Sequence, residues 1–220
     1  MVYHKAMKYI FLTINLVSTA IHLYASYNKN QHLRNITKPF IISSLLGYYC
    51  LSANIVRWEM VLALIFSWLG DIFLIGKGIR YFTIGGISFM IGHFFFILSY
   101  LYDITFSNMS FVVVGVLAIC FLIAVTIIFK NLKAYLPKAL FYPMYLYLLI
   151  NGENNCFAVF RYLSNSDFRT LLTCVGAFMF FVSDSSLFFV RFKKDTFFKT
   201  HFVVMLTYSI GELLIVLGML

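Results

Sequence analysis

Residues 111–129 read FVVVGVLAICFLIAVTIIF, a run without a single charged side chain. A helix needs about 20 consecutive apolar residues to cross the hydrocarbon core of a bilayer. This run therefore predicts a membrane-spanning helix, and comparable runs lie on both sides of it. Working outward from it, the sequence predicts an all-α transmembrane bundle of about eight helices, at 7–26, 39–56, 57–76, 81–102, 111–129, 138–160, 170–190 and 197–219.

The composition supports the same class of fold. Of the 220 residues, 62% are hydrophobic and 11% are charged, and the mean hydropathy is +0.90. Soluble domains have about a quarter of their residues charged, so a water-soluble fold is excluded. The length suits one integral-membrane domain over residues 1–220. The first run is too long for a signal-peptide core and lacks a small-x-small cleavage site, so we expect a retained helix.

The basic residues predict an orientation. In alternate loops they divide into twelve on one side and five on the other, which together make the chain's 17. The richer side is expected to be cytoplasmic, so both termini would be non-cytoplasmic in a multi-pass inner- or plasma-membrane protein. The twelve are Lys29, Arg34, Lys38, Lys77, Arg80, Lys130, Lys133, Lys138, Arg191, Lys193, Lys194 and Lys199; the five are Lys5, Lys8, Arg57, Arg161 and Arg169.

Two other functional classes find little support in the sequence. The net charge of +9 is spread over helix ends rather than gathered into a patch, which argues against nucleic acid as a partner. The four cysteines are widely spaced and include no CxxC pair, so neither a zinc nor a redox site is predicted. We expect no metal and no cofactor.

Three acidic residues lie inside predicted spans. Asp71, Asp184 and Glu212 have apolar neighbours on both sides, and a carboxylate at the middle of a membrane costs about 2.5–3.5 kcal/mol on insertion scales. Helical periodicity places further polar residues on the helix faces that carry these acidic residues, and one more on the predicted helix at 81–102. These are Ser67, His93, Ser183 and Tyr208. The loop count puts Asp71 and Asp184 at one depth, which suggests a shared polar cavity.

Structural roles could also explain these residues. A single intramembrane Asp is often a hydrogen-bonding group, and a lone His is more often packed than functional. Tyr142, Tyr145 and Tyr147 fit an interfacial aromatic belt. The polar stretch at 151–155 predicts a sixth helix that is short or partly unwound.

Short motifs in five of the predicted helices resemble the YhhN family of membrane lysoplasmalogenases. They occur in the order and spacing of that family and cover most of the chain. Glu212 stands where members of the family usually have Gln. The motifs are Lys38-Pro39, Phe66-Ser67-x-x-Gly70-Asp71-x-x-Leu74, Gly86-x-x-Phe89-x-x-Gly92-His93, Gly176-Ala177-x-x-Phe180-x-x-Ser183-Asp184-x-x-Leu187 and Thr207-Tyr208-x-x-x-Glu212-x-Leu214-Ile215.

The resemblance implies hydrolysis of the vinyl ether bond of a lysophospholipid taken from the bilayer. Like glycoside hydrolysis, this reaction needs a protonated carboxyl group and a carboxylate, and Asp71 and Asp184 would form that pair. The resemblance also implies roles for the other polar and basic residues. Ser67 and Ser183 would orient the carboxyl groups, His93 and Tyr208 would line the pocket or hold water, and Lys77, Arg80, Arg191 or Lys193 would bind the phosphate.

Two other functions remain open at this point. A proton-coupled transporter or lipid carrier could use the same carboxylates as a proton relay. A ceramidase-like metalloenzyme would need several histidine ligands, whereas His4, His22 and His32 look terminal or interfacial and no HxxxH motif occurs.

Overall fold

The computed structural model describes residues 2–106, 110–193 and 201–220. These residues form eight α-helices and no β-strand, which confirms the predicted all-α bundle. The helices are α1 (Val2–Tyr27), α2 (Gln31–Ser52), α3 (Trp58–Ile75), α4 (Ile79–Leu101), α5 (Phe111–Lys133), α6 (Phe141–Ser164), α7 (Phe168–Phe188) and α8 (His201–Gly218). A 3₁₀ turn, η2 (Lys138–Leu140), precedes α6, and a π-helical turn, η3 (Phe189–Lys193), follows α7.

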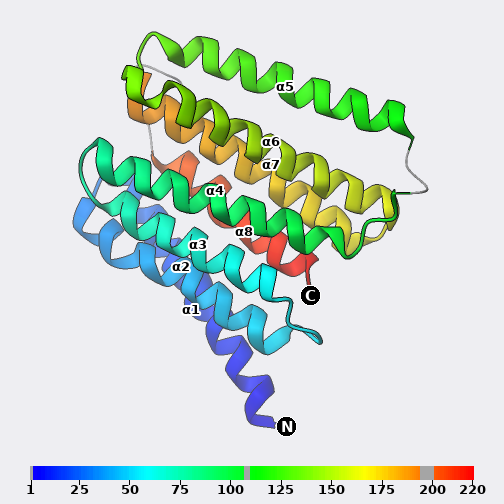
Figure 1. The fold of residues 1–220 in the computed structure, drawn as a ribbon. Helices are drawn as coiled ribbons and strands as arrows, with labels where there is room; N and C mark the ends of the chain where they lie inside the picture. The colour runs from blue at the N-terminus through cyan, green and yellow to red at the C-terminus, as the bar shows by residue number, and fades with distance from the viewer. Residues whose placement is uncertain (1, 107–109, 194–200) are drawn as a thin grey trace.

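Seven of the helices close into a ring. Helix α1 packs on α2, α2 on α3 and α3 on α4; α4 then packs on α6, α6 on α7 and α7 on α8. Helix α8 completes the ring by contacting α1 and α2. Helix α5 lies outside the ring against α6, as the outermost helix in Figure 1.

Six helices within the described ranges are long and apolar enough to cross a membrane. They cover Met7–Tyr27, Trp58–Ile75, Ile79–Leu101, Val112–Lys133, Phe168–Lys193 and His201–Gly218, as in a multi-pass membrane protein. Helices α2 and α6 are not apolar enough to be included, because both carry polar side chains that face the interior of the bundle. In α6, Asn151, Asn154 and Asn155 are buried.

Two helices differ from the sequence prediction. Helix α6 is continuous from Phe141 to Ser164 rather than partly unwound. Within it, Asn151 donates to Asp184 on α7, and Asn155 donates to the backbone oxygen of Asn151 one turn earlier, which is compatible with an intact helix. Helix α2 begins at Gln31, well before Pro39, with the side chain of Asn30 accepting a hydrogen bond from the backbone N–H of Leu33. Residues 197–200 of the last predicted range lie outside the described residues.

Helices α7 and α8 cross backbone to backbone. A Cβ placed on Gly176 would lie 2.6 Å from the carbonyl oxygen of Gly211, and one placed on Gly211 would lie 2.9 Å from that of Gly176. Small residues allow this approach in membrane bundles, where packing replaces the hydrophobic drive between helices. The crossing fixes Asp184, near the end of α7, against the first turns of α8.

Candidate active site

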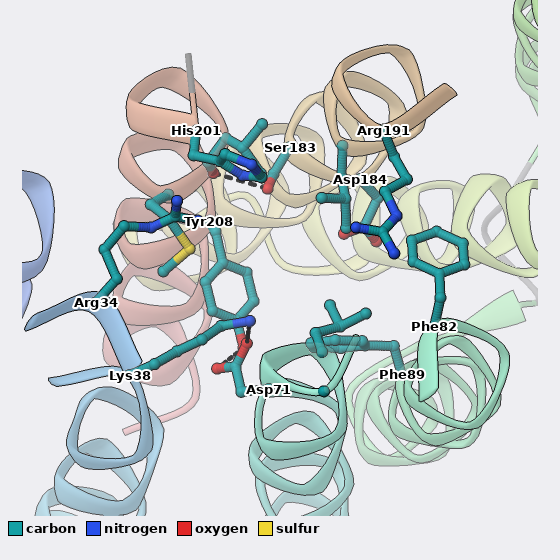
Figure 2. Close-up of a pocket in the computed structure, with 15 residues that line it drawn as sticks. Arg34, Lys38, Asp71, Phe82, Phe89, Ser183, Asp184, Arg191, His201 and Tyr208 are labelled. Atoms are coloured by element: carbon teal, nitrogen blue, oxygen red, sulfur yellow. Dashed lines mark hydrogen bonds and ion pairs between the residues drawn. The ribbon is translucent and has the colours of Figure 1, made fainter. Parts of the chain in front are cut away.

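A polar pocket of about 80 Å³ lies at one end of the ring, where α2, α4 and α8 begin and α3 and α7 end. Figure 2 shows side chains from these helices converging on it. A single water molecule needs about 10–15 Å³ measured in this way, so the pocket has room for several. Its lining consists of Arg34, Lys38, Asp71, Leu74, Gly76, Phe82, Phe89, Ser183, Asp184, Leu187, Arg191, His201, Val204, Met205 and Tyr208.

Asp71 faces the pocket from α3 as one half of an ion pair. Its side chain is 2% exposed, and Oδ1 lies 3.1 Å from Lys38 Nζ on α2. The hydroxyl of Tyr208 on α8 donates to Oδ2 at 2.9 Å. The carboxylate therefore has a fixed countercharge and a neutral donor, from two different helices.

Asp184 faces the same pocket from α7 but has a different set of partners. Its Oδ2 accepts hydrogen bonds from the hydroxyl of Tyr147 and from Asn151 Nδ2 at 2.7 Å, both on α6. His93 Nε2 on α4 lies 3.3 Å from the same oxygen. No lysine or arginine in the described chain pairs with Asp184, and no hydrogen bond reaches its Oδ1. That oxygen is the one left to face the pocket.

The ring of His93 is held firmly in place. It packs against Phe180 at 4.6 Å between ring centroids and meets Tyr147 edge-on. The residue is 1% exposed, and its Nδ1 has no hydrogen-bond partner among the described residues. His93 thus sits behind Asp184, within reach of the carboxyl group but away from the pocket lining.

The two predicted serines do not contact the carboxylates. Ser183 lines the pocket, and its hydroxyl donates to the backbone oxygen of Val204 at 2.9 Å. Ser67 is buried, and its hydroxyl has no partner among the described residues. The side chains hydrogen-bonded to Asp71 and Asp184 are instead tyrosines, an asparagine and a histidine.

Glu212 lies in α8 outside the pocket lining. It is fully buried, and neither of its carboxyl oxygens has a hydrogen-bond partner among the described residues. A buried carboxyl group without partners costs less when neutral than when charged.

Not all of the predicted phosphate-binding residues line the pocket. Arg191 lines the pocket from η3, with its guanidinium 5.7 Å from the ring centroid of Phe82. Lys77, between α3 and α4, and Arg80, in the first turn of α4, are exposed and are not among the lining residues. Arg34, from the first turn of α2, takes their place at the pocket.

Four residues at the site were given no role in it by the sequence analysis: Arg34, Lys38, Tyr147 and Asn151. The assignment of Tyr147 to an interfacial belt was wrong, because its side chain is 6% exposed and bonds to Asp184. The spacing of these residues in the sequence could have identified them. Arg34 and Lys38 are four residues apart, as are Tyr147 and Asn151, so each pair lies on one helix face.

No group of three or more His, Cys, Asp or Glu side chains with metal-binding geometry occurs in the described ranges. A model of the YhhN family matches residues 33–219, nearly the whole chain, which confirms the resemblance. No curated protein and no solved structure matches the chain.

Proposed function

Because the chain belongs to the YhhN family, we propose that it is a membrane hydrolase that cleaves the vinyl ether bond of lysoplasmalogens. The products would be a fatty aldehyde and a glycerophospho-alcohol. One observation carries the proposal: two buried carboxyl groups, one paired with a lysine and one with neutral donors, line a single pocket. Such unequal surroundings are how enzymes keep one carboxyl group protonated and its partner ionised.

Asp184 is the proton donor in this proposal. Unlike Asp71, it has no lysine or arginine partner among the described residues. Tyr147 and Asn151 both donate to Oδ2, so Oδ1 is left to carry the proton. Transfer of that proton to the β-carbon of the vinyl ether gives an oxocarbenium ion and an Asp184 carboxylate.

Asp71 acts in the second half of the reaction. Its carboxylate, paired with Lys38, stabilises the oxocarbenium ion and accepts a proton as water adds to the cationic carbon. In the resulting hemiacetal, the bond to the glycerol oxygen breaks. That oxygen takes the proton from Asp71, and the hemiacetal hydroxyl returns its proton to Asp184. One water is consumed, and both carboxyl groups regain their starting states.

The cations at the pocket would hold the phosphate of the substrate. Arg34 and Arg191 line it from opposite sides, on α2 and on η3. A guanidinium group binds phosphate oxygens in a bidentate manner. The phosphate would thus lie at the basic end of the bundle, with the ether bond directed toward the carboxyl groups.

Aldehyde release by the purified protein tests this function. With a lysoplasmalogen in detergent, mass spectrometry should detect aldehyde from wild type, and Asp71→Asn or Asp184→Asn should reduce the rate by about a hundredfold or more. Glu153→Gln, at an exposed carboxylate on α6, is the matched control and should remain active. Detergent abolishes any gradient, so a proton-coupled transporter would release no aldehyde. Near-normal turnover by either Asp variant would remove the carboxyl pair from the mechanism.

A further inference from the structure

A second cavity of about 550 Å³ lies beside the polar pocket, between α4 and α6. Its volume falls in the range of roughly 300–1,000 Å³ typical of sites for small molecules. None of its lining residues is charged. They are Phe82, Thr83, Gly86, Ile87, Met90, Leu140, Tyr142, Pro143, Met144, Tyr145, Leu146, Tyr147, Leu149 and Phe188. We call this cavity the α4–α6 groove.

The α4–α6 groove adjoins the polar pocket. A small gap of about 20 Å³ lies between them and shares lining residues with both. Gly86 and Tyr147 line both the gap and the groove, whereas Phe89 and Asp184 line both the gap and the pocket. Asp184 therefore stands where the apolar space meets the polar one.

The groove also reaches the outer surface of the ring. Side chains at its rim are exposed: Tyr142 by 87%, Leu146 by 49% and Ile87 by 45%. In a membrane-spanning bundle, that surface between two helices faces lipid. An amphiphile could enter sideways from the bilayer without leaving an apolar environment.

We propose that the α4–α6 groove binds the single hydrocarbon chain of a lysophospholipid and thereby sets the vinyl ether beside Asp184. This inference rests on the proposed function and adds the site where the hydrocarbon chain of the substrate binds. The polar pocket, at about 80 Å³ and lined by Arg34, Lys38 and Arg191, has no space for a second acyl chain. One apolar groove adjoining one small cationic pocket selects a lipid with one chain.

Gly86 offers a substitution that fills the groove without disturbing the fold. A Cβ added there would meet no atom within 4 Å. Gly86→Leu should raise the KM for a long-chain lysoplasmalogen at least tenfold. Gly115→Leu on α5, where a Cβ also meets nothing within 4 Å, is the matched control and should leave this KM unchanged. An unchanged KM in Gly86→Leu would overturn the inference.

A binding experiment separates this inference from the proposed function. The probe is a saturated alkyl-ether lysophospholipid, which cannot be hydrolysed, with a diazirine at the chain terminus. After irradiation, labelled peptides should cover α4 and α6 around the groove, and Gly86→Leu should lose this labelling. Groove labelling that is equally strong in wild type and Gly86→Leu would contradict the inference. If wild type is labelled in the groove but releases no aldehyde, the proposed reaction fails and the chain site stands.

Discussion

The two carboxyl groups differ because their partners differ. Each accepts a hydrogen bond from a tyrosine, Tyr208 for Asp71 and Tyr147 for Asp184. A lysine completes the surroundings of Asp71, whereas an asparagine and a histidine complete those of Asp184. The chemistry of the site thus depends on residues that do not themselves exchange protons with substrate.

Tyr147→Phe tests the contribution of one such residue. The ring, which packs against His93 and Phe188, would be kept, but the hydrogen bond to Asp184 would be lost. A hydrogen bond to a charged group is worth about 1.5–3 kcal/mol, so kcat should fall about ten- to a hundredfold. Tyr145→Phe, whose ring packs on Phe129 instead, is the control. Equal activity of the two variants would exclude a role for the Tyr147 hydroxyl.

Lys38→Met tests the ion pair. It would leave Asp71 buried without its countercharge, which should destabilise the protein by about 3–5 kcal/mol. The double variant Lys38→Met, Asp71→Asn carries no unpaired charge and should regain most of the lost stability without regaining activity. Thermal unfolding in detergent measures both effects. A double variant that is as unstable as Lys38→Met alone would contradict an ion pair at this site.

Between helices, close backbone contact and polar clamps hold the ring together. The α7–α8 crossing at Gly176 and Gly211 lies on the helices that carry Asp184 and Tyr208. At the end of the bundle away from the pocket, Asp103 accepts hydrogen bonds from Arg57 at 2.6 and 2.9 Å and from Arg161 at 2.7 Å. Arg161 also donates to Thr173 at 2.6 Å, so this clamp joins α3, α4, α6 and α7.

Gly176→Ala tests the crossing. The new methyl group would meet the backbone of α8, at Gly211 and Ile215, rather than a movable side chain. Overpacking of this kind costs about 1–3 kcal/mol, so the midpoint of thermal unfolding should fall. Gly115→Ala, in open space on α5, should leave it unchanged. A Gly176→Ala protein as stable as wild type would mean that the two helices separate without cost.

Asp103→Asn tests the clamp through its pH dependence. Partial burial works against it, but hydrogen bonds from Arg57 and Arg161 hold the pKa of Asp103 below its usual value. A lowered pKa gives stability that is complete above the unfolded value of about 3.9 and is lost as the pH falls through the folded value. At a pH above the unfolded value, Asp103→Asn should be less stable than wild type by roughly 1–2 kcal/mol. On acidification, the variant should lose less stability than wild type does. Glu59→Gln, also near this end, is the control.

For the whole molecule, the basic residues predict which side of the membrane holds the pocket. The pocket lies at the end of the ring that carries Lys77 and Arg80. The test uses a variant without native cysteines. If that end is cytoplasmic, a cysteine introduced by Lys77→Cys should not react with an impermeant thiol reagent in intact cells. Ser166→Cys, in the exposed α6–α7 turn, should react. The reverse labelling would invert the orientation.

The sequence predicted the helices and the two central carboxyl groups because both follow from local physics. A run of apolar residues must be helical in lipid, and a carboxylate within such a run, as at Asp71, stands out at once. The partners could not be found in this way. Tyr208 and Asp71 are 137 positions apart, and only the closure of the ring brings them together. Tyr147 was misread because an aromatic near a helix end usually lies at the membrane interface.

Helices α2 and α6 have a consequence for how the protein is made. Neither is apolar enough to be recognised as a span by its own hydropathy, yet α2 contributes Lys38 and α6 contributes Tyr147 and Asn151 to the site. Each polar residue becomes tolerable in lipid only when its partner helix is present, α3 for Lys38 and α7 for Asn151. We therefore expect the two helices of each pair to insert together, α2 with α3 and α6 with α7. The side chains that hold the two carboxyl groups in place are thus the same ones that make α2 and α6 depend on the next helix.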